Sequence, residues 1–166
     1  GSHGPTYFKR YPKEMGQFQP DCQRADIENC SVEQIVNTYD NTILYTDFVI
    51  AEMIKRLQKL EDKYNTALVY VSDHGESLGE NGMFLHGFPY SLAPSGQTQV
   101  PMILWMSEGF EQTKAIDRNC MQDHAQSKTY SHDNLFHSML GIMDVKTQDY
   151  DADLDLFKQC RTLTAS

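Results

Sequence analysis

Three polar side chains, Asp73, His74 and Glu76, follow directly on an apolar run that extends from Ala67 to Val71. That run is rich in β-branched and aromatic residues, which is typical of a buried strand. A carboxylate and a neutral imidazole are good ligands for a borderline metal such as zinc. Because Gly75 allows a turn where the strand ends, Asp73 and His74 can converge on one ion. The pattern favours a metal site here over the alternative in which Asp73 caps a turn and His74 is a surface residue.

A glycine-rich loop continues from this point and ends in His86-Gly87. Its glycines, Gly79 and Gly82, permit the chain to fold back over the end of the strand. We therefore expect His86 to lie near Asp73 and His74.

The same residues carry a resemblance to a known family. Several long motifs match the phosphoethanolamine transferases of the alkaline phosphatase and sulfatase superfamily: Val71-Ser-Asp-His-Gly-Glu-Ser-Leu-Gly-Glu-Asn-Gly82, Leu85-His-Gly87, Gln99-Val-Pro-Met102, Gly1-Ser-His-Gly-Pro-Thr6 and Asn37-Thr-Tyr-Asp-Asn41. That family includes lipid A modifying enzymes and the mobile colistin-resistance enzymes, and the sequence looks most similar to the mobile group. The resemblance covers essentially the whole chain.

The resemblance implies an α/β fold, the three-layer α/β/α sandwich of the alkaline phosphatase type. Residues 1–166 would be the C-terminal part of its soluble catalytic domain. The family's N-terminal transmembrane domain, its threonine nucleophile and its glutamate zinc ligand have no match here. The resemblance therefore also implies that this chain alone binds zinc weakly and does not turn over.

For the parent enzyme, the resemblance implies zinc-dependent transfer of phosphoethanolamine from phosphatidylethanolamine to lipid A. This reaction would take place at the periplasmic face of a bacterial inner membrane and confer polymyxin and colistin resistance. By motif matching, Asp73 and His74 would bind zinc, while His3 and His86 would act on the phosphoryl group. Glu76 matches a glutamate at the same substrate site.

Two alternative functions remain open. One is a metal-dependent phosphodiesterase or sulfatase of the same superfamily, which the continuation Ser77-Leu-Gly-Glu-Asn-Gly82 and the later His86 disfavour. The other is a non-catalytic zinc-binding fragment, whose metal site would be closed by four protein ligands rather than keep an open position.

Composition and charge limit the class of protein and the kinds of partner that this chain can have. Apolar residues make up 40% of the 166 residues, which is typical of a globular domain. The formal net charge of −9 argues against a nucleic-acid partner, because phosphate backbones require basic patches. No apolar run approaches the roughly 20 residues that span a bilayer.

Four cysteines, Cys22, Cys30, Cys120 and Cys160, allow three pairings. The short loop between Cys22 and Cys30 favours that pair, which would stabilise the fold by roughly 2.5 kcal/mol in the chain-entropy model. Cys120 and Cys160 would then pair by elimination. An even count with one close pair favours an oxidising compartment over a cytosolic protein with free thiols.

Helical periodicity predicts a long helix that opens at a Ser31–Gln34 capping box and ends near Lys59. A second strand is expected over Val100–Met106, in a parallel sheet with the first, and a loosely helical stretch over Glu108–Asn119. Ser131 begins a last helix that stops at Gly141. Its expected buried face is formed by Leu135, Phe136, Met139 and Leu140.

Three further stretches have open or minor interpretations. The loop from Phe88 to Gln99 is a lid, a wall for a lipid head group or a plain surface excursion. The acidic run Asp149–Asp155 is expected to be a solvated tail. His124 and His132 are expected to be surface or cap residues.

Overall fold

A computed structural model describes residues 1–162. They form two compact units, the first made of Gly1–Arg56 with Val69–Ile103 and the second of Leu57–Leu68 with the chain from Leu104 onward. The first unit contains the candidate site and the second contains most of the shorter helices. Among the described residues, no helix has the length and apolar character needed to cross a bilayer.

Helix α1, Val32–Gln58, is the main element of the first unit. Its start is the predicted capping box, because Gln34 N donates to Ser31 Oγ at 3.2 Å and Ser31 N donates to Gln34 Oε1 at 2.9 Å. Lys55 and Arg56 lie in its last turn, where cations interact favourably with the helix dipole. The predicted helix is confirmed to within a residue at each end.

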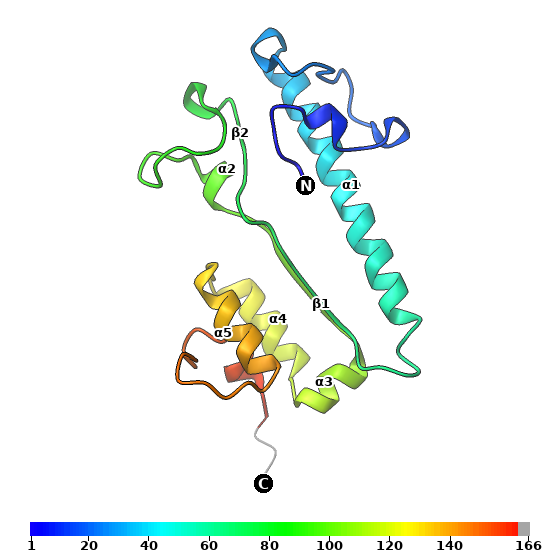
Figure 1. Cartoon of the computed structure of the whole chain (residues 1–166), viewed down its shortest axis with the longest axis vertical. Helices are drawn as coiled ribbons and strands as arrows, with labels where there is room; N and C mark the ends of the chain where they lie inside the picture. The colour runs from blue at the N-terminus through cyan, green and yellow to red at the C-terminus, as the bar shows by residue number, and fades with distance from the viewer. Residues whose placement is uncertain (163–166) are drawn as a thin grey trace. The chain divides into compact units, whose positions relative to one another are not determined.

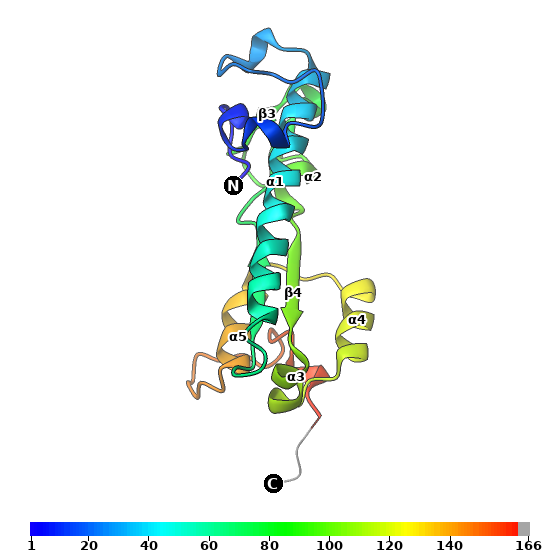
Figure 2. The ribbon, with the colours of Figure 1, turned by 90° about the vertical axis from the view of Figure 1, so that its right-hand side faces the viewer.

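The first thirty residues pack against the N-terminal half of α1 (Figures 1 and 2). They contain only short 3-10 turns, Tyr7–Lys9, Lys13–Met15 and Ile27–Asn29. A core of Tyr7, Cys22, Ile27 and Ile35 holds the segment to the helix.

Two further connections fix this segment. Asn41 of α1 is fully buried and binds Phe18 twice, accepting from its N–H at 2.9 Å and donating to its carbonyl at 3.0 Å. The predicted Cys22–Cys30 disulfide is present, with the two Cα atoms 5.9 Å apart. These contacts hold the segment that carries His3 against α1.

Strand β1, Ala67–Val71, has the predicted bounds, and it pairs with β4, Met102–Met106. Ser72 N donates to Pro101 O at 3.2 Å and Ser107 N donates to Thr66 O at 2.9 Å. Residue numbers therefore run in opposite senses along the two strands, so the pair is antiparallel and the expected parallel pairing is wrong. β1 is only half-buried, with Val69 39% exposed, so the expectation of a buried strand is not met.

A small hairpin follows β1 in the first unit. Strands β2, Ser77–Leu78, and β3, Phe84–Leu85, pair antiparallel across the turn Glu80–Gly82. The short helix α2, Ser95–Thr98, lies against β2, where Gln97 Nε2 donates to Ser77 Oγ at 2.8 Å. This part of the loop from Phe88 to Gln99 is therefore a support for the hairpin, whereas Tyr90 and Leu92 are exposed.

The second unit contains helices α3 (Glu108–Lys114), α4 (Arg118–Ser127) and α5 (Asp133–Ile142), and the C-terminal turn Lys158–Cys160. The expected helical stretch is broken in two at Ala115, which adopts a left-handed conformation with φ of 54°. A core of Ile116, Ile142 and Phe157 joins these elements, and the Cys120–Cys160 disulfide is present as expected.

Two expectations for this unit are wrong. Phe136 is 56% and Met139 41% exposed, because α5 instead turns Ser138 and Ile142 inward, and Ser138 Oγ accepts from Leu156 N at 2.9 Å. Asp155 is not a solvated tail residue: it is buried and accepts from Tyr150 Oη at 2.6 Å and from Phe157 N at 2.9 Å.

Candidate functional site

The β2–β3 hairpin brings the two ends of the glycine-rich loop together. Its register places Ser77 opposite Leu85. The next residues outward on each strand, Glu76 and His86, are therefore also opposite each other, and His86 Nδ1 lies 3.1 Å from Glu76 Oε1. Sequence alone predicted that His86 returns to the strand end, and the hairpin confirms it.

Close backbone packing fixes the other side of this loop. Gly75 N donates to Gln97 O at 3.0 Å, and a Cβ added to Gly75 would lie 1.9 Å from the carbonyl oxygen of Gly96. Only glycine fits this approach. The packing holds the turn that carries His74 immediately after β1 ends at Val71.

Three histidines from separate segments meet at this point. His3 comes from the N-terminal segment, His74 from the turn after β1 and His86 from the turn after β3. One possible ligand atom of each lies within 4.8 Å of the other two. The ring centroids are 4.6 Å apart for His3 and His86, 4.1 Å for His74 and His86, and 5.8 Å for His3 and His74.

Each of the three rings has its Nδ1 atom against an oxygen acceptor. His3 Nδ1 lies 2.7 Å from Gly4 O, and His74 Nδ1 lies 3.0 Å from Gly75 O. His86 Nδ1 faces the Glu76 carboxylate. Because a carbonyl or ionised carboxylate oxygen only accepts hydrogen bonds, each ring is assigned its proton at Nδ1. This tautomer leaves the lone pair of every Nε2 atom available for a ligand.

Glu76 is buried beneath the cluster and is surrounded by donors. Its Oε1 accepts from Gly4 N at 3.1 Å, and its Oε2 accepts from Tyr7 Oη at 3.2 Å. Burial, followed by the charge and hydrogen bond of Glu76, raises the pKa of Tyr7 well above its ordinary value of 10.0, so the phenol remains a donor. With His86 added, the carboxylate oxygens face three partners from inside the protein.

Asp73 stands apart from the three histidines. Its carboxylate is 89% exposed, and Asp73 Oδ2 lies 3.8 Å from His74 Nε2. Its slight desolvation raises the pKa of this carboxyl, but the His74 backbone amide, which donates to Asp73 Oδ1 at 3.1 Å, and the nearby His74 ring outweigh that effect. The pKa of Asp73 is therefore below its ordinary value, and the carboxylate is ionised at neutral pH.

This donor set fits zinc. Imidazole nitrogens and a carboxylate oxygen are ordinary zinc ligands, and atoms bound to one zinc at about 2 Å lie no more than about 4 Å apart. The 3.8 Å separation of Asp73 Oδ2 and His74 Nε2 meets that limit already. The Glu76–His86 contact has the form of the carboxylate–histidine pairs that orient metal ligands.

The sequence predicted His3, Asp73, His74, Glu76 and His86 as site residues, and the structure brings all five into one region of the first unit. It did not predict a role for Tyr7, which lies in the irregular N-terminal segment. An aromatic residue in an irregular segment gives no sign that its hydroxyl will meet a carboxylate 69 positions away.

Comparison with known proteins identifies the family. Residues 1–145 match the family model described as Sulfatase. The soluble domain of lipooligosaccharide phosphoethanolamine transferase A from Neisseria meningitidis superposes with a TM-score of 0.94 at 47% identity, over 98% of this chain and 48% of that chain. The expected alkaline phosphatase-like α/β fold is thereby confirmed.

Curated relatives agree. Phosphoethanolamine transferase EptA from Escherichia coli K12 is 50% identical over 99% of this chain and 30% of its own length. Phosphatidylethanolamine transferase Mcr-2 from Escherichia coli is 39% identical over 87% of this chain and 25% of its own length. This EptA is thus more similar than Mcr-2, contrary to the expectation that the mobile group is the most similar. The chain spans less than a third of the length of either relative. It belongs to the sulfatase family and within that family resembles the phosphoethanolamine transferases.

Proposed function

We propose that this chain provides the histidine cluster of a zinc-dependent phosphoethanolamine transferase. The parent enzyme takes phosphoethanolamine from phosphatidylethanolamine and transfers it to lipid A at the periplasmic face of the inner membrane, which lowers sensitivity to polymyxins such as colistin. The observation that carries the proposal is the convergence of His3, His74 and His86, each with its Nδ1 atom on an oxygen acceptor. Support also comes from the 50% identity to EptA of Escherichia coli K12.

In this proposal Asp73 and His74 bind zinc, which polarises the phosphoryl oxygens and makes the attacking hydroxyl more acidic. The threonine nucleophile and a further glutamate ligand, which the family resemblance implies, come from sequence outside the motifs present here. Consequently we expect these 166 residues to bind zinc weakly when isolated and to show no turnover.

His3 and His86 act on the phosphoryl group. Their Nε2 atoms are free to contact its oxygens, because their Nδ1 atoms already face Gly4 O and Glu76. A histidine in this position stabilises the charge that develops on phosphoryl oxygens or protonates the departing alkoxide.

Glu76 acts at the substrate site through His86. Its carboxylate accepts from Gly4 N and Tyr7 Oη inside the protein, so it is a positioning residue that fixes the tautomer and direction of His86.

A chimera tests the transferase activity directly. The 164 residues of Escherichia coli EptA that align with this chain are replaced by it, and lipid A is analysed by mass spectrometry. We expect phosphoethanolamine-modified lipid A from the chimera and none from its His74→Ala variant. A well-expressed, membrane-inserted chimera without modified lipid A would overturn the proposal.

Zinc affinity of the isolated chain tests the site without turnover. Competition with a chromogenic chelator should give weak binding that His74→Ala abolishes, because His74 is one of the two proposed ligands. His137→Ala is the matched control, because His137 lies in the second unit and accepts from Asp151 N at 2.9 Å. Binding unaffected by His74→Ala would remove Asp73 and His74 as the metal ligands.

A further inference from the structure

The second unit contains another group of potential ligands, in which His124 lies against the Cys120–Cys160 disulfide. Among residues 1–162 only two such groups occur, this one and the histidine cluster. Cys120 and His124 are four residues apart on α4, so their side chains share one face of the helix. His124 Nε2 lies 3.9 Å from Cys120 Sγ, and His124 Nδ1 lies 3.4 Å from Cys160 Sγ.

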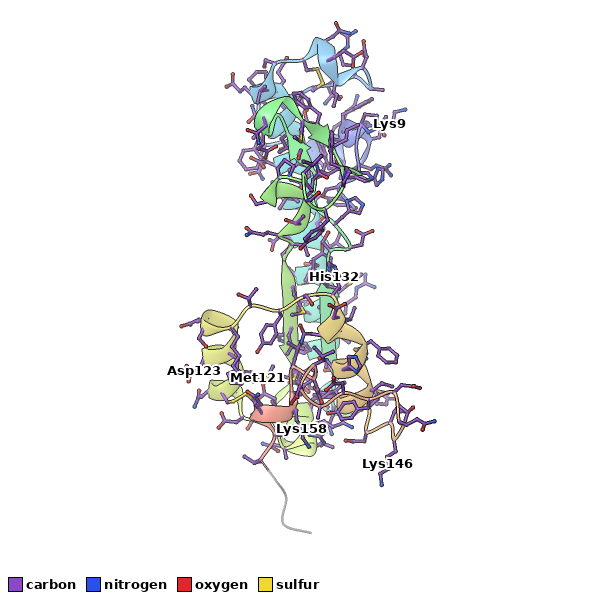
Figure 3. The ribbon with its side chains drawn as sticks, turned by 90° about the vertical axis from the view of Figure 1, so that its left-hand side faces the viewer. Lys9, Met121, Asp123, His132, Lys146 and Lys158 are labelled. Carbon is purple, nitrogen blue, oxygen red and sulfur yellow. A yellow bond between two sulfur atoms is a disulfide. The ribbon has the colours of Figure 1, made fainter. Side chains whose placement is uncertain are left out.

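The chain around Cys160 is held to the start of α4 independently of the disulfide. Asp117 N donates to Cys160 O at 2.8 Å, and Thr162 N donates to Ala115 O at 2.8 Å. Arg161 Nε adds a hydrogen bond of 3.1 Å to Lys114 O. Figure 3 shows α4, with Met121 and Asp123 labelled, beside the C-terminal segment that carries Lys158.

These contacts have a consequence for the reduced protein. Because the backbone hydrogen bonds and the buried Phe157 hold both segments, breaking the sulfur–sulfur bond leaves the two thiols and the imidazole close together. Two thiolates and one imidazole are a donor set that zinc prefers, and three protein ligands leave one tetrahedral position for water.

We propose that Cys120, His124 and Cys160 form a zinc site that exists only when their disulfide is reduced. A phosphine reductant with one water opens the bond: phosphorus gives up two electrons and gains the oxygen, and the two sulfurs take the two protons of the water. On binding zinc each thiol then releases its proton to solvent. Zinc binding and disulfide formation exclude one another, because both use the same two sulfur atoms.

The other disulfide provides an internal control. Cys22 and Cys30 belong to the first unit, and no group of three potential ligands among the described residues includes them. Cys22 Sγ instead contacts Arg24 O at 3.8 Å. Once reduced, this pair offers zinc two thiolates without a third ligand.

Thiol alkylation tests the site residue by residue. The whole chain is reduced with a phosphine, which does not compete strongly for zinc, and then alkylated with N-ethylmaleimide with and without zinc. Peptide mass spectrometry follows each cysteine. We expect zinc to slow alkylation of Cys120 and Cys160 by about 10-fold or more, and to leave Cys22 and Cys30 nearly unchanged.

His124→Ala should remove this protection, whereas Gln126→Ala, on the same helix, should keep it. Equal protection of both cysteine pairs, no protection of either, or protection that survives His124→Ala would overturn the proposal. Cobalt(II) gives a second readout on the reduced protein without any substitution, since a thiolate-to-cobalt absorption band that zinc displaces is expected only from a thiolate site. The histidine cluster has no sulfur ligand, so neither readout depends on the proposed transferase function.

Discussion

Removing the hydroxyl of Tyr7 is the sharpest test of how the candidate site is held together. Tyr7 is 2% exposed and its hydroxyl donates to Glu76 Oε2 at 3.2 Å. The variant Tyr7→Phe keeps the ring in the core but deprives Oε2 of the one donor that it has in the described structure. Glu76 itself is only 5% exposed, so water does not readily replace the lost hydrogen bond.

The expected cost follows from the charge and burial of the acceptor. A hydrogen bond to a charged group contributes about 1.5–3 kcal/mol, and a buried acceptor left unpaired loses this in full. We therefore expect Tyr7→Phe to lower the free energy of unfolding by about 2 kcal/mol. With a urea m-value of about 2 kcal/mol/M, the unfolding midpoint should fall by about 1 M.

Urea unfolding followed by circular dichroism measures this shift. Tyr39→Phe is the matched control, because the Tyr39 ring packs edge-on against Tyr7 with centroids 5.7 Å apart, yet no hydrogen bond of its hydroxyl is seen among the described residues. The control should change stability by less than about 0.5 kcal/mol. If Tyr7→Phe is no more destabilising than Tyr39→Phe, then Tyr7 does not hold Glu76, and the positioning argument for His86 loses its support.

Two further predictions concern other parts of the chain. Gly75→Ala places a Cβ 1.9 Å from Gly96 O, so we expect the free energy of unfolding in urea to fall by about 1–3 kcal/mol. Zinc binding should also weaken, because the same turn carries the proposed metal ligands. Hydrogen bonds from Lys114 and then from Arg161 hold the pKa of Asp144 below its ordinary value of 3.8. The ionised Asp144 carboxylate therefore stabilises the folded state at neutral pH, and this stabilisation is lost as the pH falls through the lowered pKa. Asp144→Asn should therefore lower the free energy of unfolding by less than about 1 kcal/mol at pH 7. The difference in unfolding free energy between the variant and the unaltered protein should shrink in acid, and a difference that grows in acid would contradict this assignment.

Local signals in the sequence predicted the local structure well. The capping box at Ser31 fixed where α1 begins, and the apolar run from Ala67 to Val71 gave the bounds of β1. The short spacing of Cys22 and Cys30 predicted their disulfide. Each of these features depends on residues within a few positions of one another, which is why sequence reasoning reaches them.

Features set by distant contacts were harder to predict. Periodicity placed Phe136 and Met139 on the buried face of α5, but the contact between Ser138 and the chain at Leu156 decides which face turns inward. The pairing direction of β1 and β4 also depends on how the intervening loop returns, and two isolated apolar runs carry no information on that.

The candidate site shows the same contrast between features set by local patterns and features set by distant contacts. The candidate site residues could be predicted from the sequence alone, because the types and spacing of Asp73, His74, Glu76 and His86, with the motif around His3, are local patterns. The contacts of Glu76 with Tyr7 and the Gly4 amide are visible only in the folded chain, since those hydrogen bonds join residues about 70 positions apart. Such a contact depends on the packing of the N-terminal segment against α1 and the hairpin, and no short-range pattern encodes it.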